Sequence, residues 1–106
     1  MALHHLDAGE KVHLPSLDAL SGAKAVALVK TDRFETLELV LGAGDAIPSH
    51  AVLGYTTLHC LKGRVVIEAA GEIELSAGDW LYLGRGQAHA VAALDDSSVL
   101  VTILFD

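Results

Sequence analysis

The chain has 106 residues, of which 52% are hydrophobic, and a formal net charge of −7. This length suits one small domain and not two, and the hydrophobic fraction argues against disorder. The few Lys and Arg residues are scattered along an acidic chain, so the composition argues against nucleic-acid partners and anionic membrane surfaces.

The sequence predicts a cytoplasmic protein. No apolar run is long enough to span a bilayer, and the N-terminus lacks the basic region and apolar stretch of a signal peptide. The single cysteine, Cys60, cannot form an intramolecular disulfide, which fits a reducing compartment. So many hydrophobic residues in so short a chain also predict a buried face between identical subunits.

Short strand-like segments follow one another along the chain, separated by glycine-rich turns. Residues 14–22 are expected to form a loop that leads into the first long strand, with one helical turn as the alternative. Between the later segments, Ala70-Gly71 predicts a tight hairpin turn. The expected strands span residues 23–30, 34–41, 55–61, 64–69, 72–75, 79–83, 89–94 and 98–105.

Strands at this spacing, with no sustained helical period, predict an all-β antiparallel sandwich or closed barrel. An Ala-Gly-Asp sequence at 43–45 recurs at 77–79, each time ahead of a strand and then a histidine. This half-repeat indicates a double Greek key of two similar hairpin units packed face to face. We expect one domain over residues 1–106.

Two glycine–histidine pairs resemble the two sequence motifs of small single-domain cupins of the RmlC-like superfamily. Gly44 and His50 have the spacing of the first motif, which Gly63 closes. Gly78, Gly86 and His89 have the spacing of the second. The resemblance implies a jelly-roll barrel (double-stranded β-helix) over about residues 36–105, preceded by an N-terminal arm over 1–22.

The resemblance implies only part of a metal site. Cupin metal sites use three histidines and a glutamate inside the barrel, and such ligands suit Fe, Mn, Ni or Zn. Here His50 and His89 remain as candidate metal ligands, whereas Val52 and Thr56 stand at the positions of another histidine and the glutamate. Gly84 and Ala93 also replace the usual proline and asparagine of the second motif.

Other side chains would have to complete such a site. Strand alternation from Thr56 places Leu58 and Cys60 on the same face, so Cys60 is a candidate thiolate ligand. A bulge that turns His59 inward is a second candidate, and the phenol of Tyr55 is a third. None of these spacings is a known metal signature.

The candidate pocket is largely apolar. We expect the barrel interior to include His50, His89, Val52, Thr56, Leu58, Cys60 and Tyr82. Such a lining suits a small, partly apolar organic molecule. His4, His5 and His13 lie near the N-terminus in no pattern that assigns them a role.

Several functions remain open from the sequence, which does not decide whether the chain is an enzyme. The first is a binding or sensory protein that holds a small molecule beside His50 and His89. The alternative is a metal-dependent dioxygenase or isomerase with a two-histidine site, or a metal-free enzyme with a histidine base. A third is a sensor domain that acts through a partner protein.

The resemblance also implies a homodimer, because small cupins pair through sheet faces and an exchanged N-terminal strand. Residues 11–14 have strand character and no obvious partner within their own barrel. We therefore expect two copies of the chain to associate.

Overall fold

The structure, a computed structural model, describes residues 5–15 and 24–105. In these ranges it is all-β, and eight of its nine strands lie within one residue, at either end, of a predicted segment. The strands are β1 (Lys24–Lys30), β2 (Phe34–Leu41), β3 (Ala46–His50), β4 (Tyr55–Lys62), β5 (Arg64–Glu68), β6 (Glu72–Ser76), β7 (Trp80–Leu83), β8 (His89–Ala93) and β9 (Ser97–Leu104).

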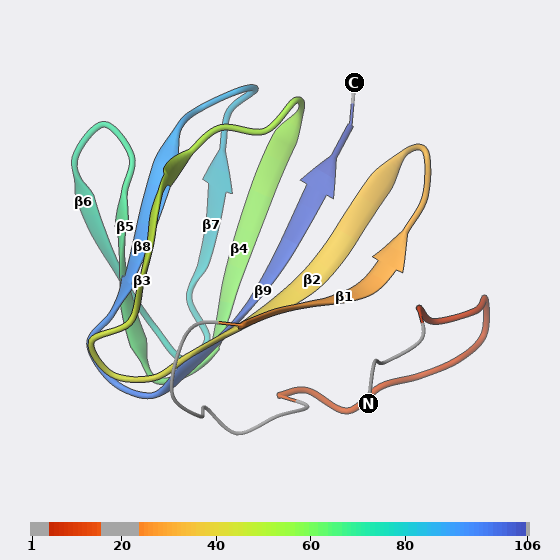
Figure 1. Cartoon of the computed structure of the whole chain (residues 1–106), viewed down its shortest axis with the longest axis horizontal. Helices are drawn as coiled ribbons and strands as arrows, with labels where there is room; N and C mark the ends of the chain where they lie inside the picture. Colours follow the sequence, from red (N-terminus) through yellow and green to blue (C-terminus); the bar gives the residue numbers. More distant parts are fainter. Residues whose placement is uncertain (1–4, 16–23, 106) are drawn as a thin grey trace.

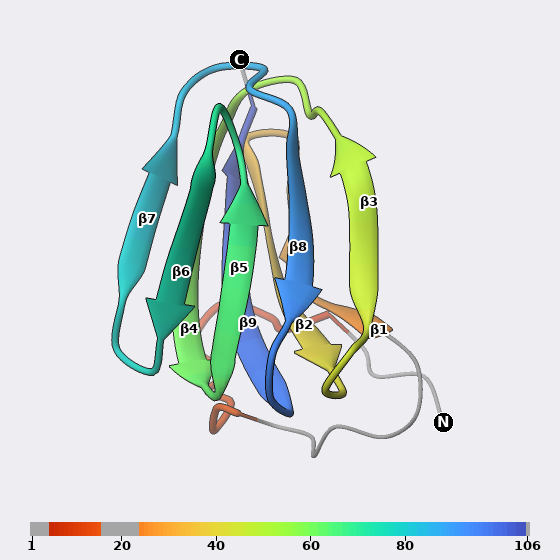
Figure 2. The same ribbon diagram turned by 90° about the vertical axis from the view of Figure 1, so that its left-hand side faces the viewer.

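The strands form two antiparallel sheets that pack face to face. The larger sheet has the order β1-β2-β9-β4-β7 and the smaller has the order β3-β8-β5-β6. Figure 1 shows the larger sheet spread across the view, and Figure 2 shows the smaller sheet in front of it. Alternate side chains of each strand point between the sheets, where Leu58, Val65, Ile67 and Val99 are completely buried. The predicted jelly-roll class is confirmed.

Strand β3 is the one strand that the sequence analysis did not predict. Its sequence, Ala-Ile-Pro-Ser-His, is mostly exposed, and Pro48 has no N–H to donate. A proline can occupy this strand because β3 lies at the edge of the smaller sheet and pairs only with β8. Its register shifts between Ile47 and His50, which brings His50 opposite His89.

The hairpin between β5 and β6 confirms the predicted turn at Ala70-Gly71. Glu68 pairs with Glu72 across it, and the Ala69 N–H donates to the Gly71 carbonyl over 2.8 Å. Gly71 has a φ of 128°, in a region that other residues avoid.

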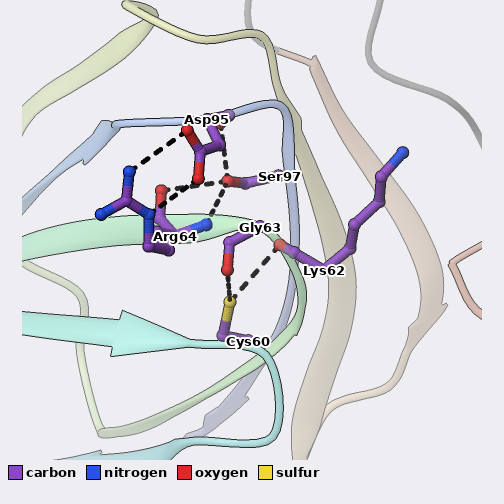
Figure 3. A network of polar contacts seen from close by, with 6 residues as sticks. All are labelled: Cys60, Lys62, Gly63, Arg64, Asp95 and Ser97. Carbon is purple, nitrogen blue, oxygen red and sulfur yellow. Dashed lines mark hydrogen bonds and ion pairs between the residues drawn. The ribbon is translucent and has the colours of Figure 1, made fainter.

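A polar network fixes the corner between β4 and β5 to the turn before β9 (Figure 3). The Ser97 hydroxyl accepts from the Arg64 N–H over 3.1 Å and lies 2.8 Å from the Asp95 carbonyl and 3.1 Å from the Arg64 carbonyl. The Arg64 guanidinium donates to the Asp95 carboxylate over 2.8 Å, and each side chain is about half exposed. The fully buried Ser97 therefore anchors this corner more firmly than the exposed ion pair does.

The outward faces of the two sheets differ in charge. The smaller sheet carries Glu68, Glu72 and Glu74 on its outer face, where they alternate with the buried Ile67 and Leu75. On the outer face of the larger sheet, β2, β9, β4 and β7 carry a single carboxylate. It belongs to Glu38, which is completely buried and accepts a 2.6 Å hydrogen bond from the Ser98 hydroxyl. The exposed side chains that these four strands place on this face therefore carry no negative charge.

The N-terminal arm is described only for residues 5–15. The Leu6 N–H donates to the Leu28 carbonyl, so this segment lies against β1. Residues 11–14 form no strand here, and the predicted loop at 14–22 falls largely outside the described residues. No helix in the described ranges is long and apolar enough to cross a membrane.

Candidate functional site

A cavity of about 210 Å³ lies between the two sheets. Its polar lining consists of His50, His89 and Thr56, and its apolar lining consists of Ala25, Leu37, Leu39, Ile47, Val52, Val101 and Ile103. Ala25 and His50 are exposed members on the edge strands β1 and β3, so the cavity opens between these two edges. No Lys, Arg, Asp or Glu is among the described residues that line it.

The two histidines meet because β3 and β8 are paired. His50 and His89 are register partners, and their ring centroids lie 4.5 Å apart with the planes tilted by 53°. Each ring is also held by its own chain: the Nδ1 of His50 is 3.1 Å from the Pro48 carbonyl, and that of His89 is 3.3 Å from the Gln87 carbonyl. The rings are thereby fixed in orientation before any ligand arrives.

Burial sets the protonation of His89. Its side chain is 3% exposed, and loss of hydration lowers its pKa below the ordinary value near 6.5. The Gln87 carbonyl opposes this change by favouring the protonated ring, and the neighbouring His50 adds to it. His89 is therefore neutral at neutral pH.

We expect the stability of the protein to fall as the pH is lowered below about 6.5. Below that pH the unfolded chain binds a proton at His89, whereas the folded chain resists this proton because its His89 has a lowered pKa. The contribution of His89 to the free energy of unfolding is therefore complete above pH 6.5 and is lost as the pH falls towards the pKa of the folded state. Urea unfolding at several pH values measures the slope. A His89→Gln variant should show a shallower dependence than the wild type; equal slopes for the two proteins would contradict the assignment.

The predicted pocket residues separate into two groups. His50, His89, Val52 and Thr56 all line the cavity. Leu58 and Cys60 point between the sheets as strand alternation predicted, but both are completely buried in the core and do not line the cavity. Ile47 of β3 and inward residues of β1, β2 and β9 complete the lining. Alternation along β1, β2 and β9 was the signal that would have identified the residues on those strands.

The predicted interior position of Tyr82 is wrong. Tyr82 pairs with Thr57 on the outer face of the larger sheet and is 54% exposed, while its neighbours Leu81 and Leu83 point inward. Tyr55 is on the same outer face, stacked on Tyr82 with the ring centroids 6.3 Å apart. A phenol from either residue is on the opposite side of the sheet from His50.

Neither Cys60 nor His59 reaches the histidine pair. The Cys60 thiol donates to the carbonyls of Lys62 and Gly63 at the β4–β5 corner (Figure 3). Burial raises its pKa, so it is a thiol and not a thiolate. His59 pairs with Trp80 and Leu100 on the outer face, with no bulge there to turn it inward.

The residues present do not fit a complete cupin metal centre. Among the described residues, no group of three or more His, Cys, Asp or Glu side chains is placed to hold a metal ion. Val52 offers no donor atom, and Thr56 offers only a neutral hydroxyl. Two imidazoles alone are a weak ligand set for a catalytic metal, which usually takes three protein ligands.

Comparison with solved structures places this fold among the cupins. A cupin superfamily protein from Desulfitobacterium hafniense matches with a TM-score of 0.85 and 23% identity, covering 100% of both chains. An RmlC-like cupin from Desulfovibrio desulfuricans matches with a TM-score of 0.72 and 24% identity, covering 98% of this chain and 96% of the other. The cupin domain of Cnp3 from Schizosaccharomyces pombe has a TM-score of 0.78 and 17% identity, covering 91% and 74%.

These likenesses confirm the predicted cupin resemblance at the level of the fold. The sequence itself matches no protein family model. No curated protein gives a significant match to it either. Because one fold hosts many activities, function has to be argued from the cavity.

Proposed function

We propose that the chain binds a small organic molecule in the cavity between its sheets, with His50 and His89 as the polar contacts. The observation that carries this proposal is the cavity itself, in which two oriented imidazoles and the Thr56 hydroxyl are the polar groups of a largely apolar lining. Small-molecule sites typically combine an apolar wall with a few placed polar groups.

The size of the cavity limits the ligand. A dry apolar cavity of about 150 Å³ is enough to hold benzene. The volume here, about 210 Å³, therefore suits a molecule of one ring or a short chain. Phosphorylated ligands are disfavoured, because no cationic side chain among the described lining residues would balance their charge.

The alternative, a metal-dependent dioxygenase or isomerase, would use the same two histidines. The donor set argues against it, because neither the described lining residues nor Cys60, which does not reach the pair, supplies a third ligand. A metal-free reaction with His89 as general base also lacks a second titratable group, besides His50, among the described lining residues. We therefore favour binding over catalysis.

We expect the purified, untagged protein to carry far less than one equivalent of Fe, Mn, Ni or Zn after dialysis without chelator. Two imidazoles without an anionic ligand hold these ions weakly. Plasma mass spectrometry measures the content, with the His50→Ala, His89→Ala double variant as the baseline. A near-stoichiometric metal content in the wild type that this variant loses would favour a metal-dependent enzyme over a binding protein.

Blocking the cavity tests the proposed function. Ala25 lies at the exposed rim, so Ala25→Trp should fill the opening without disturbing the buried core. Lys24→Trp is the matched control, since Lys24 is the adjacent residue of β1 and points to the opposite face. A fragment screen by thermal shift should yield ligands that stabilise the wild type and the control but not Ala25→Trp. Ligands that stabilise all three proteins equally would place the binding site elsewhere.

We further propose a cytoplasmic homodimer. Cys60 is buried and free, as suits a reducing compartment. The outer face of the larger sheet is the surface we assign to the dimer, because its exposed part is apolar and carries no carboxylate on a chain of net charge −7. The proposal includes the exchange of N-terminal segments between the two copies of the chain.

A further inference from the structure

We propose that the ligand of this cavity is a neutral molecule with a compact apolar body and a hydroxyl or N–H donor, of the phenol or alcohol class. This inference rests on the proposed function, since it names the kind of molecule that the cavity binds. It follows from the hydrogen bonds that hold the two histidine rings.

The backbone fixes the tautomer of both rings. A carbonyl oxygen can only accept, so the Nδ1 atoms that lie 3.1 Å from the Pro48 carbonyl and 3.3 Å from the Gln87 carbonyl each carry a proton. In a neutral imidazole the other nitrogen is then unprotonated. His50 and His89 therefore each have Nε2 as a hydrogen-bond acceptor.

The two rings stand close together, and no charged side chain is among the described residues of the lining. His89 is 3% exposed, and its ring centroid is 4.5 Å from that of His50, so a charge on either ring would meet its neighbour at short range. No carboxylate among the described lining residues would stabilise an imidazolium. The cavity thus offers two acceptors, with the Thr56 hydroxyl as its third polar group.

Among ligands small enough for the cavity, the two Nε2 acceptors favour those that can donate a hydrogen bond. A carboxylate would face two lone pairs with no cation in the lining, and an ammonium would lose its hydration with no anion to replace it. A hydrocarbon or an ether fills the space but leaves both Nε2 atoms without a donor. A hydroxyl group donates to one imidazole while its apolar body packs against side chains such as Leu39, Val101 and Ile103.

Three probes of similar size test this preference: phenol, toluene and benzoate. Isothermal titration at pH 7.5 should show phenol binding at least tenfold more tightly than toluene, and no binding of benzoate. Ala25→Trp should abolish the binding of both neutral probes, which locates them in the cavity. His50→Phe, a change at an exposed position, should reduce the preference for phenol over toluene.

The outcomes separate the two proposals. Equal affinities for phenol and toluene, both lost in Ala25→Trp, would overturn the donor preference and leave the binding function standing. Stronger binding of benzoate would also overturn the preference. If none of the three probes bound at millimolar concentration, the proposed function would fail together with this inference.

A direct measurement of the tautomers does not depend on any variant. Nitrogen-15 chemical shifts of the imidazole rings distinguish a protonated Nδ1 from a protonated Nε2. The expected spectrum shows His50 and His89 both protonated at Nδ1 at pH 7.5. Protonation of either ring at Nε2 would make that histidine a donor to the cavity and would overturn the inference.

Discussion

Gly54→Ala is expected to remove a large part of the protein's stability. A Cβ at this position would overlap the backbone carbonyl of Leu104 and press on the Cα of Phe105, and neither is a flexible side-chain end that can move aside. The φ of 121° adds backbone strain for any residue with a Cβ. We expect a loss of about 4 kcal/mol or more, a large part of the 5–15 kcal/mol that typically stabilises a domain.

Gly71→Ala is the matched control for this change. Gly71 has a φ of 128°, close to that of Gly54, but an added Cβ there meets no atom within 4 Å. Its substitution should therefore cost only the backbone strain, about 1–3 kcal/mol. Urea unfolding of both variants measures the difference. If the two variants lost the same free energy of unfolding within about 0.5 kcal/mol, the close approach of Gly54 to Leu104 would not explain the effect of Gly54→Ala.

The same contact connects stability with the candidate site. Gly54 stands between the cavity residues Val52 and Thr56, and its carbonyl accepts from the Gly86 N–H over 3.0 Å. Gly86 belongs to the turn that leads to His89. The turns that carry both histidine strands are therefore joined through Gly54, so a ligand in the cavity should partly restore the stability of weakened variants in this region.

Periodicity was enough to predict most of the fold, for physical reasons. In β2, the alternation of Leu37, Leu39 and Leu41 with other residues follows the two-residue period of a strand with one face in the core. The turn at Ala70-Gly71 was predictable because few residues adopt a positive φ there. Strand β3 lacked both signals, since Pro48 and an exposed edge position remove the apolar alternation.

The position of Tyr82 shows where single-sequence reasoning fails. All four residues of β7 are apolar or aromatic, so the sequence does not say which pair faces the core. The pairing with β4 decides, because Leu83 lies opposite Thr56 and Leu81 opposite Leu58, both inward residues. Tyr82 was predicted to face the interior, but the register places the leucines there.

Parts of the site depend on contacts that no sequence pattern carries. The spacing of the two glycine–histidine motifs identified His50 and His89, but not which nitrogen of each ring is protonated. That follows from the carbonyls of Pro48 and Gln87, each two residues before its histidine. The complete burial of Glu38 beside Ser98 depends on tertiary packing, which no strand pattern reveals.

The wild-type protein should sediment at twice the 11.1 kDa mass of the chain at micromolar concentration, and Trp80→Lys should sediment as a monomer. Trp80 is 61% exposed and Tyr82 54% exposed on the outer face of the larger sheet, next to the half-buried Leu61 and His59. Exposed aromatic residues of this kind dominate binding energy at protein interfaces. On an acidic chain, this face is also where two copies can approach without carboxylates opposing each other.

The expected effect of Trp80→Lys is large because a twofold interface contains each residue twice. A loss of about 2 kcal/mol at each copy weakens dimerisation by about a thousandfold. Leu94→Lys is the matched control, since Leu94 is 43% exposed in the turn between β8 and β9 and the charge changes by the same amount. It should remain a dimer. A monomeric wild type would refute the assignment of this face, and so would a dimer that Leu94→Lys disrupts and Trp80→Lys leaves intact.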